Sequence, residues 1–402
     1  MLACTLGKVK VITLGCTAVT ARLRGPQMVA RTILVNASYA PSLIAFRGAL
    51  LERMVGEGNR VYAAAPDILG PIAEKLTAIG VTPVSVALSR TGLNPVADVA
   101  YYRSVRRIIR RYGIDLILSY TIKPCIWGSL AAHAEGVESV SLVTGLGYAF
   151  IPGGGLKQRI VRAISITLWR RATAANRTVI FQNPDDRDDF IRAGALSDGG
   201  KARLVNGSGV DMQEFGRAEL PSDPRFLMIA RLLGNKGVRE YAAAAREMKA
   251  EGSPARFTLA GYFDDGPDAI GRDEVERWTA AGLDFIGPQD DVRPALANCS
   301  VYVLPSYREG TPRTVLEAMA TGRPVITTDV PGCRQTIEHE VSGLLVAPQD
   351  TRSLADAMRR MARDTEGRRQ MGEAAFQRCR ERYAVKAVNK AMFTHVGLSG
   401  SP

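Results

Sequence analysis

Two successive runs of short apolar segments, parted by helical patterns, place the strongest constraint on the fold of this chain. Each segment is continuous and ends in a polar or glycine-rich turn, which is typical of a parallel strand buried on both faces. The first run predicts strands at 31–37, 60–66, 115–120, 140–145, 178–183 and 202–208. The second run predicts strands at 225–232, 255–262, 283–288, 301–306 and 323–329.

The alternation of strands with helices, for example the helical pattern at 101–113, predicts an α/β chain of two Rossmann-like domains that face each other. A polar segment with two prolines, 216–224, separates the two runs, and 402 residues with 46% apolar content can supply two cores. We expect domains at 28–215 and 222–380. Ligands should bind in a deep cleft between them, at the carboxyl ends of the strands.

The first 27 residues do not fit this pattern. The segment 11–21 follows two lysines and resembles a weak signal-peptide core, but a strand-like start reappears at Met28. We expect 1–27 to be an upstream extension, with a misassigned start codon as one explanation and a signal peptide as the alternative. Deleting these residues should leave activity intact. No apolar run reaches the roughly 18 residues of a membrane span.

Charge and cysteine content narrow the classes of partner. A formal charge of +12 favours an anionic partner, and nucleic acid, anionic lipid and a phosphorylated small molecule all remain open. The six cysteines are scattered without a CxxC pair, and the chain has three histidines. This distribution predicts neither a zinc site nor a disulfide framework, and it favours a reducing compartment.

Two glutamates in the second run, Glu309 and Glu317, lie on either side of a predicted helix start. Thr311 is expected to be the N-cap and Pro312 the first helical residue. Glu309 then lies in the loop and Glu317 about one and a half turns inside the helix. As an alternative, the first is a solvated loop acid and the second an ordinary surface residue.

The start of this helix is a predicted anion site. The amides of Arg313 and Thr314 point outward where partial positive charge collects, so a phosphate could bind there. Carboxylates accept hydrogen bonds from vicinal hydroxyls, so glutamates on both sides of a phosphate suggest sugars on both sides of a diphosphate. Such a molecule is a nucleotide-sugar.

Arg231 and Lys236 follow the first strand of the second run, in a strand-to-helix loop that should face the same cleft. A bidentate guanidinium and a flexible ammonium are suited to neutralising a diphosphate leaving group. The alternative is a basic loop in which Lys236 is a surface charge.

These residues lie in segments that strongly resemble the retaining GT-B glycosyltransferases of family four. In the second half the resemblance rests on 207–211, 230–237, 306–326, 331–337 and 342–346. In the first half the segments 36–47, 119–132 and 143–150 resemble the branch that transfers sugars onto undecaprenyl-diphosphate-linked intermediates of bacterial polysaccharides and glycoproteins. The resemblance covers nearly everything from Met28 to about residue 390. It implies the GT-B fold, with a final helix at 381–402 that crosses back to the first domain.

The resemblance implies a role for each residue. Arg231 and Lys236 would hold the donor diphosphate, Glu309 would meet the transferred sugar, and Glu317 would bind the ribose hydroxyls. The residues expected to act in catalysis are Arg231, Lys236 and Glu309. The residues expected to bind the donor are Gly145, Gly147, Gly310, Thr311, Pro312, Arg313, Thr314 and Glu317. The loop 287–292 would lie near the base, with UDP as the carrier; no cofactor beyond this UDP-sugar substrate is implied.

The family mechanism implies retention of anomeric configuration by front-face attack, in which the departing phosphate helps to deprotonate the acceptor hydroxyl and no protein nucleophile is required. Many relatives carry a histidine near the reacting sugar, but segment 143–150 has none, and His133, His339 and His395 have no better claim. We therefore assign no histidine base. The glycines of that segment would allow close backbone approach to donor or acceptor.

Residues expected on the acceptor or membrane face are Arg47, Lys123, Arg159, Arg162 and Trp169. In the helical pattern 155–171, one stripe carries arginines with Ile166 and Trp169, and this mixture is an interfacial signature. The other stripe, which includes Ile160 and Ile164, is expected to be core. The arginine-rich pattern at 101–111 would add attraction to anionic lipid. Solvated basic faces are the alternative.

Asp186 and Asp188 formally make the DxD pattern by which other glycosyltransferases hold a divalent cation. Asn183 is a predicted N-cap and Pro184 a predicted first helical residue, so helix capping explains these aspartates without a metal. No metal is expected.

The sequence thus predicts a retaining enzyme that moves a hexose or N-acetylhexosamine from a UDP-sugar to a lipid-linked saccharide, peripherally at the cytoplasmic face of a bacterial membrane. The resemblance orders the sugars as N-acetylgalactosamine, N-acetylglucosamine and galactose. A sugar-nucleotide epimerase of the same architecture is the nearest alternative enzyme. A basic nucleic-acid-binding protein is a weaker alternative, because no recognition motif or aromatic stacking platform is evident; nucleic acid is not an expected partner.

Overall fold

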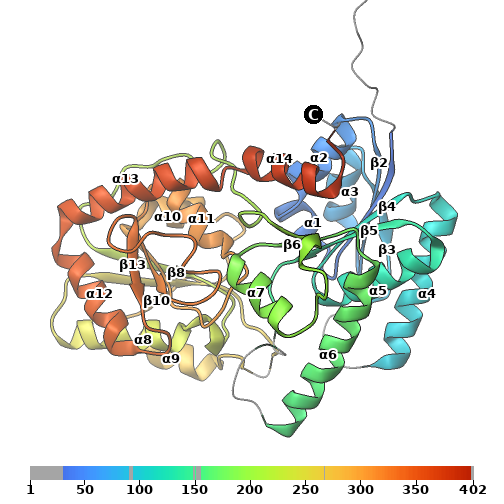
Figure 1. Ribbon diagram of the computed structural model, residues 1–402. Coiled ribbons are helices and arrows are strands. Elements are labelled where there is room, and N and C mark those ends of the chain that lie inside the picture. Colours follow the sequence, from blue (N-terminus) through green and yellow to red (C-terminus); the bar gives the residue numbers. More distant parts are fainter. Residues whose placement is uncertain (1–29, 90–93, 148–149, 151–154, 267, 400–402) are drawn as a thin grey trace, which may run out of the picture. The chain divides into compact units, whose positions relative to one another are not determined.

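The computed structural model describes residues 30–89, 94–147, 150, 155–266 and 268–399, so the expected extension at 1–27 lies outside the described residues. The described residues form two parallel sheets with helices on their faces (Figure 1). Both sheets have the strand order 3-2-1-4-5-6 that characterises the doubly wound Rossmann fold, and the first has a seventh strand. The expected α/β class is therefore confirmed.

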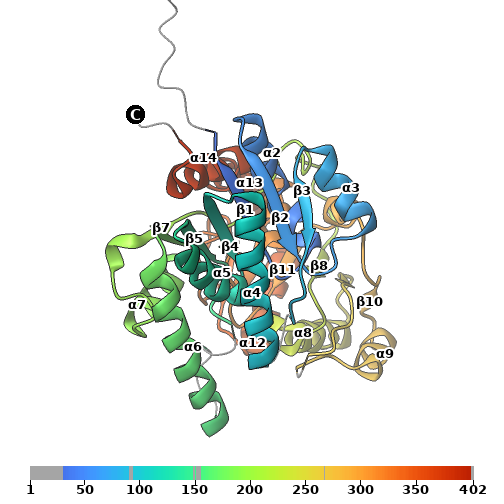
Figure 2. The same ribbon diagram turned by 90° about the vertical axis from the view of Figure 1, so that its right-hand side faces the viewer.

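The first sheet runs in the order β3-β2-β1-β4-β5-β6-β7. Its strands are β1 (Thr32–Asn36), β2 (Arg60–Ala65), β3 (Thr82–Ser85), β4 (Leu116–Tyr120), β5 (Glu138–Val143), β6 (Thr178–Phe181) and β7 (Ala202–Leu204). Its helices are α1 (Pro41–Ala45), α2 (Gly48–Gly56), α3 (Gly70–Ala78), α4 (Pro95–Tyr112), α5 (Ile122–Glu135), α6 (Leu156–Ala175) and α7 (Pro184–Arg192). Figure 2 shows α4, α5 and α6 together on one face of this sheet.

The second sheet runs in the order β10-β9-β8-β11-β12-β13. Its strands are β8 (Arg225–Ile229), β9 (Arg256–Ala260), β10 (Asp284–Phe285), β11 (Val301–Leu304), β12 (Val325–Thr328) and β13 (Gly343–Val346). Its helices are α8 (Val238–Ala250), α9 (Arg272–Ala280), α10 (Arg293–Asn298), α11 (Arg313–Ala320), α12 (Thr351–Arg363) and α13 (Thr365–Arg382). Three strands differ from the expected pattern. β10 is only two residues long, and neither β13 nor β3 of the first sheet was expected.

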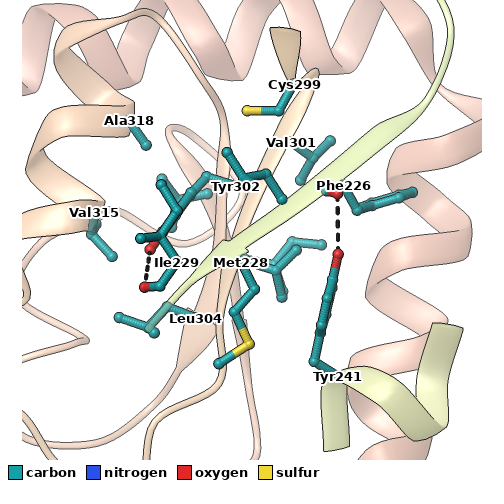
Figure 3. Packing of buried hydrophobic residues seen from close by; sticks show 14 of the residues in the cluster. Phe226, Met228, Ile229, Tyr241, Cys299, Val301, Tyr302, Leu304, Val315 and Ala318 are labelled. Atoms are coloured by element: carbon teal, nitrogen blue, oxygen red, sulfur yellow. Dashed lines mark hydrogen bonds between the residues drawn. The ribbon is translucent and has the colours of Figure 1, made fainter. Parts of the chain in front are cut away.

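The core of the second sheet surrounds β8 (Figure 3). Phe226 and Met228 on one face of β8 and Leu227 on the other are buried among side chains of neighbouring strands and helices, as a strand covered on both faces requires. Two buried tyrosines place their hydroxyls on carbonyl oxygens of β8: Tyr241 donates to Phe226 O and Tyr302 donates to Ile229 O, each at 3.1 Å. Apolar packing and satisfied polar groups together fix the strand that leads into Arg231.

The chain returns to the first sheet at its end. The last helix, α14 (Val385–Val396), lies beside α2 (Figure 1), and its apolar side chains share a core cluster with Ile33 and Val35 of β1. The expected crossover is thus present, and it takes the form of two helices, α13 and α14, with a break at Tyr383 and Ala384.

Two buried arginines hold the connection between the sheets. Arg323 donates from Nε to the Leu296 carbonyl oxygen at 3.0 Å and from Nη2 to the Glu219 carbonyl oxygen at 2.9 Å. Arg368 donates from Nη2 to the Ser222 carbonyl oxygen at 2.6 Å. Both side chains are fully buried, so main-chain oxygens stand in for a carboxylate partner and fix segment 216–224 on the second sheet.

Candidate active site

A cavity of about 740 Å³ lies between the two sheets, which is within the usual range for a small-molecule site. Its walls include residues that follow the carboxyl ends of β1, β4, β5 and β6 on one side and of β8, β9, β10 and β11 on the other. A smaller cavity of about 260 Å³ lies where β8, β9 and β10 begin. Ligands of open α/β sheets bind at the carboxyl ends of the strands, so the larger cavity is the candidate site.

Lys236 and Glu309 form an ion pair in the wall of this cavity, with Nζ 2.5 Å from Oε1. Lys236 ends a short 3₁₀ turn after β8, and Glu309 lies in the loop between β11 and α11. Ser306 Oγ donates to the same carboxylate oxygen at 2.8 Å, and the Glu309 amide donates to the Pro331 carbonyl oxygen at 3.1 Å. Both side chains are mostly buried, so the pair is held in place on several sides.

Helix α11 begins at Arg313 with Pro312 as its N-cap, one residue later than expected. Thr311 is therefore not the N-cap: its hydroxyl donates instead to the carbonyl oxygens of Gln182 and Gly310, at 3.2 and 2.9 Å. The reason is that Thr311 links the helix start to the end of β6, which sequence spacing alone does not reveal. The first amides of α11 have no partner within the helix, and Arg313 and Thr314 line the cavity.

Glu317 also reaches the cavity, although only 6% of the residue is exposed. Burial raises the pKa of its carboxyl, and the neighbouring Arg313 guanidinium partly offsets that effect. Arg313 Nε lies 2.7 Å from Glu317 Oε1, an ion pair between residues one turn apart. The side chain is therefore a partly desolvated acceptor, suited to hydroxyl groups of a ligand.

Arg231 lines the cavity from the end of β8 and donates from Nη1 to Asp264 Oδ2 at 3.0 Å. The loop expected near a base, 287–292, contributes Pro288 and the four residues after it to the same wall. The structure thus brings Arg231, Lys236, Glu309, Thr311 to Thr314 and Glu317 into one cavity.

The glycines expected to approach the donor have different neighbours. Gly310 lies so close to the first sheet that a Cβ there would come within 2.1 Å of the Thr144 carbonyl oxygen. Gly145 lies against Gly310, and a Cβ on Gly147 would come within 2.7 Å of Ile122 Cδ1. Both have positive φ, of 146° and 71°. Among the described residues of this segment Thr144 lines the cavity, and the two glycines shape the backbone that follows it.

The N-terminus of α7 anchors the Glu309 loop, a contact that the sequence did not suggest. Asn183 caps α7, accepting from the Asp186 amide at 2.7 Å as expected, and its Nδ2 donates to the Gly310 carbonyl oxygen at 2.6 Å. Arg308 Nη2 lies 2.5 Å from Asp186 Oδ1 and 2.7 Å from Asp189 Oδ2. Burial raises the pKa of Asp186, and Arg308 opposes that shift.

The DxD aspartates therefore have protein partners. Asp186 is bound as above, and Asp188 pairs with Arg187. In addition, Asp185 Oδ2 accepts from Gln335 Nε2 at 2.8 Å and from Arg334 Nη1 at 3.1 Å. Over the described residues, no group of three or more His, Cys, Asp or Glu side chains is placed to hold a metal ion.

The residues expected on the acceptor or membrane face do not form one surface. Lys123 is mostly buried in an ion pair with Asp98 at 2.9 Å. Arg47 is 3% exposed and lines the cavity, where burial lowers its pKa to about 10. Arg159 and Arg162 are exposed on α6, and Arg162 Cζ lies 5.9 Å from the Phe150 ring centre.

The expected assignment of the two stripes of α6 is wrong for Trp169, Ile160 and Ile164, whereas Arg159 and Arg162 are exposed as expected. Trp169 is 2% exposed and packs edge-on against Phe190 of α7, with ring centroids 5.0 Å apart. Ile160 and Ile164, expected in the core, are 53% and 46% exposed. The physical reason is that, among the described side chains of α6, those from Ile166 onward pack against α7 and the sheet, so a residue's position along the helix decides its burial more than its stripe does.

The three histidines lie away from the reacting groups. His133 is exposed near the end of α5, His339 Nδ1 accepts from the Leu345 amide at 3.0 Å, and His395 contacts the Leu204 carbonyl oxygen at 3.2 Å. None of them lines the cavity.

Comparisons with known proteins find similarity to glycosyltransferases. A family model described as glycosyl transferases group 1 matches residues 223–364. The chain is 26% identical over 351 residues to the N,N'-diacetylbacillosaminyl-diphospho-undecaprenol alpha-1,3-N-acetylgalactosaminyltransferase of Campylobacter jejuni subsp. jejuni, a match that covers 84% of this chain and 90% of the relative.

Two solved structures share the fold over nearly the whole chain. Sucrose-phosphate synthase from Thermosynechococcus elongatus aligns with a TM-score of 0.76 at 19% identity, over 90% of this chain and 98% of that one. Alr3699/HepE from Anabaena, solved in complex with UDP and glucose, aligns with a TM-score of 0.72 at 18% identity, over 92% of this chain and 100% of that one. The two facing sheets thus have the GT-B architecture that the sequence predicts.

Proposed function

Because residues 223–364 form a group 1 glycosyltransferase domain in a chain of GT-B architecture, we propose that the protein transfers a sugar from a UDP-sugar to a saccharide linked to polyprenyl diphosphate. The single observation that carries this function is the cavity wall in which Arg231, Lys236, the start of α11 and two glutamates converge. Cations and free amides suit a diphosphate, and carboxylates suit the sugars at its two ends.

The donor lies along this wall. Arg231 and Lys236 neutralise the diphosphate together with the amides of Arg313 and Thr314. Glu317 accepts hydrogen bonds from the ribose hydroxyls, and the loop 287–292 covers the base. The mostly buried positions of Lys236 and Glu317 support their assignments, since charges act more strongly where water is excluded.

The reaction proceeds with retention by front-face attack. The bond between the anomeric carbon and the leaving diphosphate breaks, and the acceptor oxygen bonds to that carbon on the same face. The acceptor proton passes to an oxygen of the departing diphosphate. The protein stabilises charge that develops on this leaving group, and Glu309 positions the transferred sugar; preorganised electrostatic stabilisation of this kind is usually the largest contribution to catalysis.

The acceptor assignment rests on the Campylobacter jejuni relative, whose name specifies a diphospho-undecaprenol saccharide, and which matches most of both chains. A lipid-linked acceptor requires access to a membrane. Among the described residues, the structure contains no helix with the length and hydropathy needed to span a bilayer.

We place the enzyme peripherally at the cytoplasmic face of the membrane, through α6. Its exposed Ile160 and Ile164 lie among the exposed arginines Arg159 and Arg162, a combination suited to the boundary between headgroups and acyl chains. The formal charge of +12 adds attraction to anionic lipid, and a nucleic-acid partner is not part of the proposal.

Product analysis tests this function. Purified protein is incubated with radiolabelled UDP-N-acetylgalactosamine, UDP-N-acetylglucosamine or UDP-galactose and an undecaprenyl-diphosphate-linked saccharide, and the phases are separated with organic solvent. Label should enter the organic phase with one of the three donors, as a longer lipid-linked saccharide. Label that stays in the aqueous phase as an altered nucleotide-sugar would indicate the epimerase instead.

A further inference from the structure

Arg47 is a buried arginine in the cavity wall for which the described residues provide no carboxylate. It precedes α2, and 3% of the residue is exposed. Among the described residues, its side chain donates one hydrogen bond, from Nη1 to the carbonyl oxygen of the preceding residue, Phe46, at a long 3.3 Å. The buried Nε has no partner. A guanidinium has five N–H donors, so most of this group's capacity is unused.

Arg313 brings a second guanidinium toward the same part of the cavity. Arg313 Cζ lies 5.3 Å from the centre of the Phe46 ring, and Arg47 Cζ lies 5.2 Å from the centre of the Tyr120 ring. All four side chains line the cavity. The ion pair with Glu317 accounts for the charge of Arg313, so the charge of Arg47 remains uncompensated here.

Two other arginines among the described residues are as deeply buried, and each also has one nitrogen without a partner, but their remaining nitrogens have main-chain acceptors. Arg323 and Arg368 lie away from the cavity, and each donates to several main-chain oxygens, including those of segment 216–224. Arg47 has no comparable set of main-chain acceptors among the described residues. Burying a charge without partners costs free energy, so the folded chain alone gains little from an arginine at this position. A ligand would supply the missing acceptor.

We propose that Arg47 and Arg313 form a second anion site in the cavity, which binds a phosphate group of a diphosphate substrate. The inference rests on the proposed function, because that reaction brings two diphosphates to the enzyme, one in the donor and one in the acceptor. The site is distinct from Arg231 and Lys236, which reach the cavity from β8. Its chemistry is that of a bidentate guanidinium and a phosphate in a largely desolvated setting.

Ligand binding to three forms of the full-length chain tests the site. Wild type, Arg47→Met and Arg47→Lys are titrated by calorimetry with inorganic pyrophosphate, with UDP and with farnesyl diphosphate, and the melting temperature of each protein is measured without ligand. Methionine keeps the length and apolar packing but removes the charge. Lysine keeps the charge but loses the bidentate geometry.

Arg47→Met should bind pyrophosphate about tenfold to a hundredfold more weakly, with a melting temperature equal to or above that of wild type, and Arg47→Lys should lie between. If Arg47→Met also binds UDP more weakly but farnesyl diphosphate normally, the site binds the diphosphate of the donor. If it binds farnesyl diphosphate more weakly but UDP normally, the site binds the diphosphate of the acceptor. Either result supports the site. Wild-type Kd values in both variants for all three ligands would overturn it, and so would a lowered melting temperature with unchanged Kd values.

Arg323→Met is the matched control. This buried arginine holds main-chain oxygens of Leu296 and Glu219, residues that do not line the cavity, so its loss should lower the melting temperature and leave the Kd values unchanged. Failure of the proposed function gives a different result, since wild-type protein would then transfer no sugar whatever the Kd values of the Arg47 variants.

Discussion

Lys236 Nζ lies 2.5 Å from Glu309 Oε1, so the cation assigned to the donor diphosphate is paired with the carboxylate assigned to the transferred sugar. Each side chain therefore fixes the position of the other. Ser306 adds a hydrogen bond to the same carboxylate oxygen, which leaves the second oxygen of Glu309 to interact with a ligand. Charged groups that are positioned before the substrate arrives need little reorganisation during the reaction.

Replacing Lys236 should therefore cost turnover far more than stability. Lys236→Ala removes a cation from the leaving diphosphate, and we expect kcat to fall by about two to three orders of magnitude. The melting temperature should fall modestly but the protein should stay folded, because Glu309 loses its cation partner and keeps the hydrogen bond from Ser306. Lys75→Ala, on the exposed side of α3, serves as the control and should retain normal turnover. Near-normal kcat in Lys236→Ala would remove the lysine from the mechanism.

Glu317→Gln should change stability in a pH-dependent way. Burial raises the pKa of Glu317, so the folded protein holds this proton more tightly than the unfolded chain does. The stabilisation from this proton is complete at low pH and is lost as the pH rises through the folded-state pKa. At about pH 7.5 the wild-type protein keeps a charged carboxyl buried, which costs free energy, whereas glutamine is neutral. The stability of the variant relative to wild type should therefore be highest at this pH.

Denaturant unfolding of wild type and Glu317→Gln between about pH 7.5 and pH 4.5 measures this effect. The advantage of the variant should shrink as the pH falls. UDP affinity measured at the higher pH provides the second readout, and it should be weaker in the variant because an amide oxygen is a poorer acceptor for ribose hydroxyls than a carboxylate. A stability difference that stays constant with pH would contradict the raised pKa.

Strand and helix patterns predicted most of the architecture, because parallel strands buried on both faces leave continuous apolar runs. The exceptions have physical causes. β3 is an edge strand that carries Pro83, and its residues are only partly buried, so it lacks the apolar run. β13 lies at a sheet edge and begins with Gly343, a residue that disfavours strands, so its apolar run is short.

The cavity residues of the second half could be predicted because they follow strands directly. Arg231 comes two residues after β8, and Glu309 and Glu317 flank a helix start that was wrong by one residue. The contacts of Arg308 with Asp186 and Asp189 could not be predicted, since more than a hundred residues separate the partners. Spacing also cannot reveal which turns of α6 pack against α7, so Trp169 was misplaced.

Arg308→Ala should loosen the Glu309 loop. Asp186 is almost completely buried, and loss of its guanidinium partner leaves a buried carboxyl with the Asn183 side chain as its remaining polar contact. We expect a loss of about 3 kcal/mol in the free energy of unfolding. Amides at 306–311 should exchange faster with deuterium, because the loop is no longer held to α7.

A matched control for this variant is Arg192→Ala, which removes an exposed arginine from the same Asp189 carboxylate. Surface ion pairs contribute little, so its stability should stay within about 0.5 kcal/mol of wild type. Equal exchange rates at 306–311 in Arg308→Ala and wild type would show that the loop is held by other contacts.

Activity should persist in chelator. Arg308 pairs with the Asp186 carboxylate and Arg187 with that of Asp188, so we expect turnover in excess EDTA to equal that in magnesium. The measurement is initial rate after dialysis against EDTA, with and without added Mg²⁺. Activity that disappears in EDTA and returns with Mg²⁺ would assign these aspartates, or a metal brought in with the donor, to the reaction.

The exposed stripe of α6 should determine membrane binding. Ile160→Asp with Ile164→Asp places two carboxylates where apolar side chains would enter the lipid boundary, and should sharply reduce flotation with vesicles of phosphatidylglycerol and phosphatidylethanolamine. The melting temperature should be unchanged, because both positions are solvent-exposed. If the aspartate variant still floats like wild type at moderate salt, α6 is not the membrane-binding element.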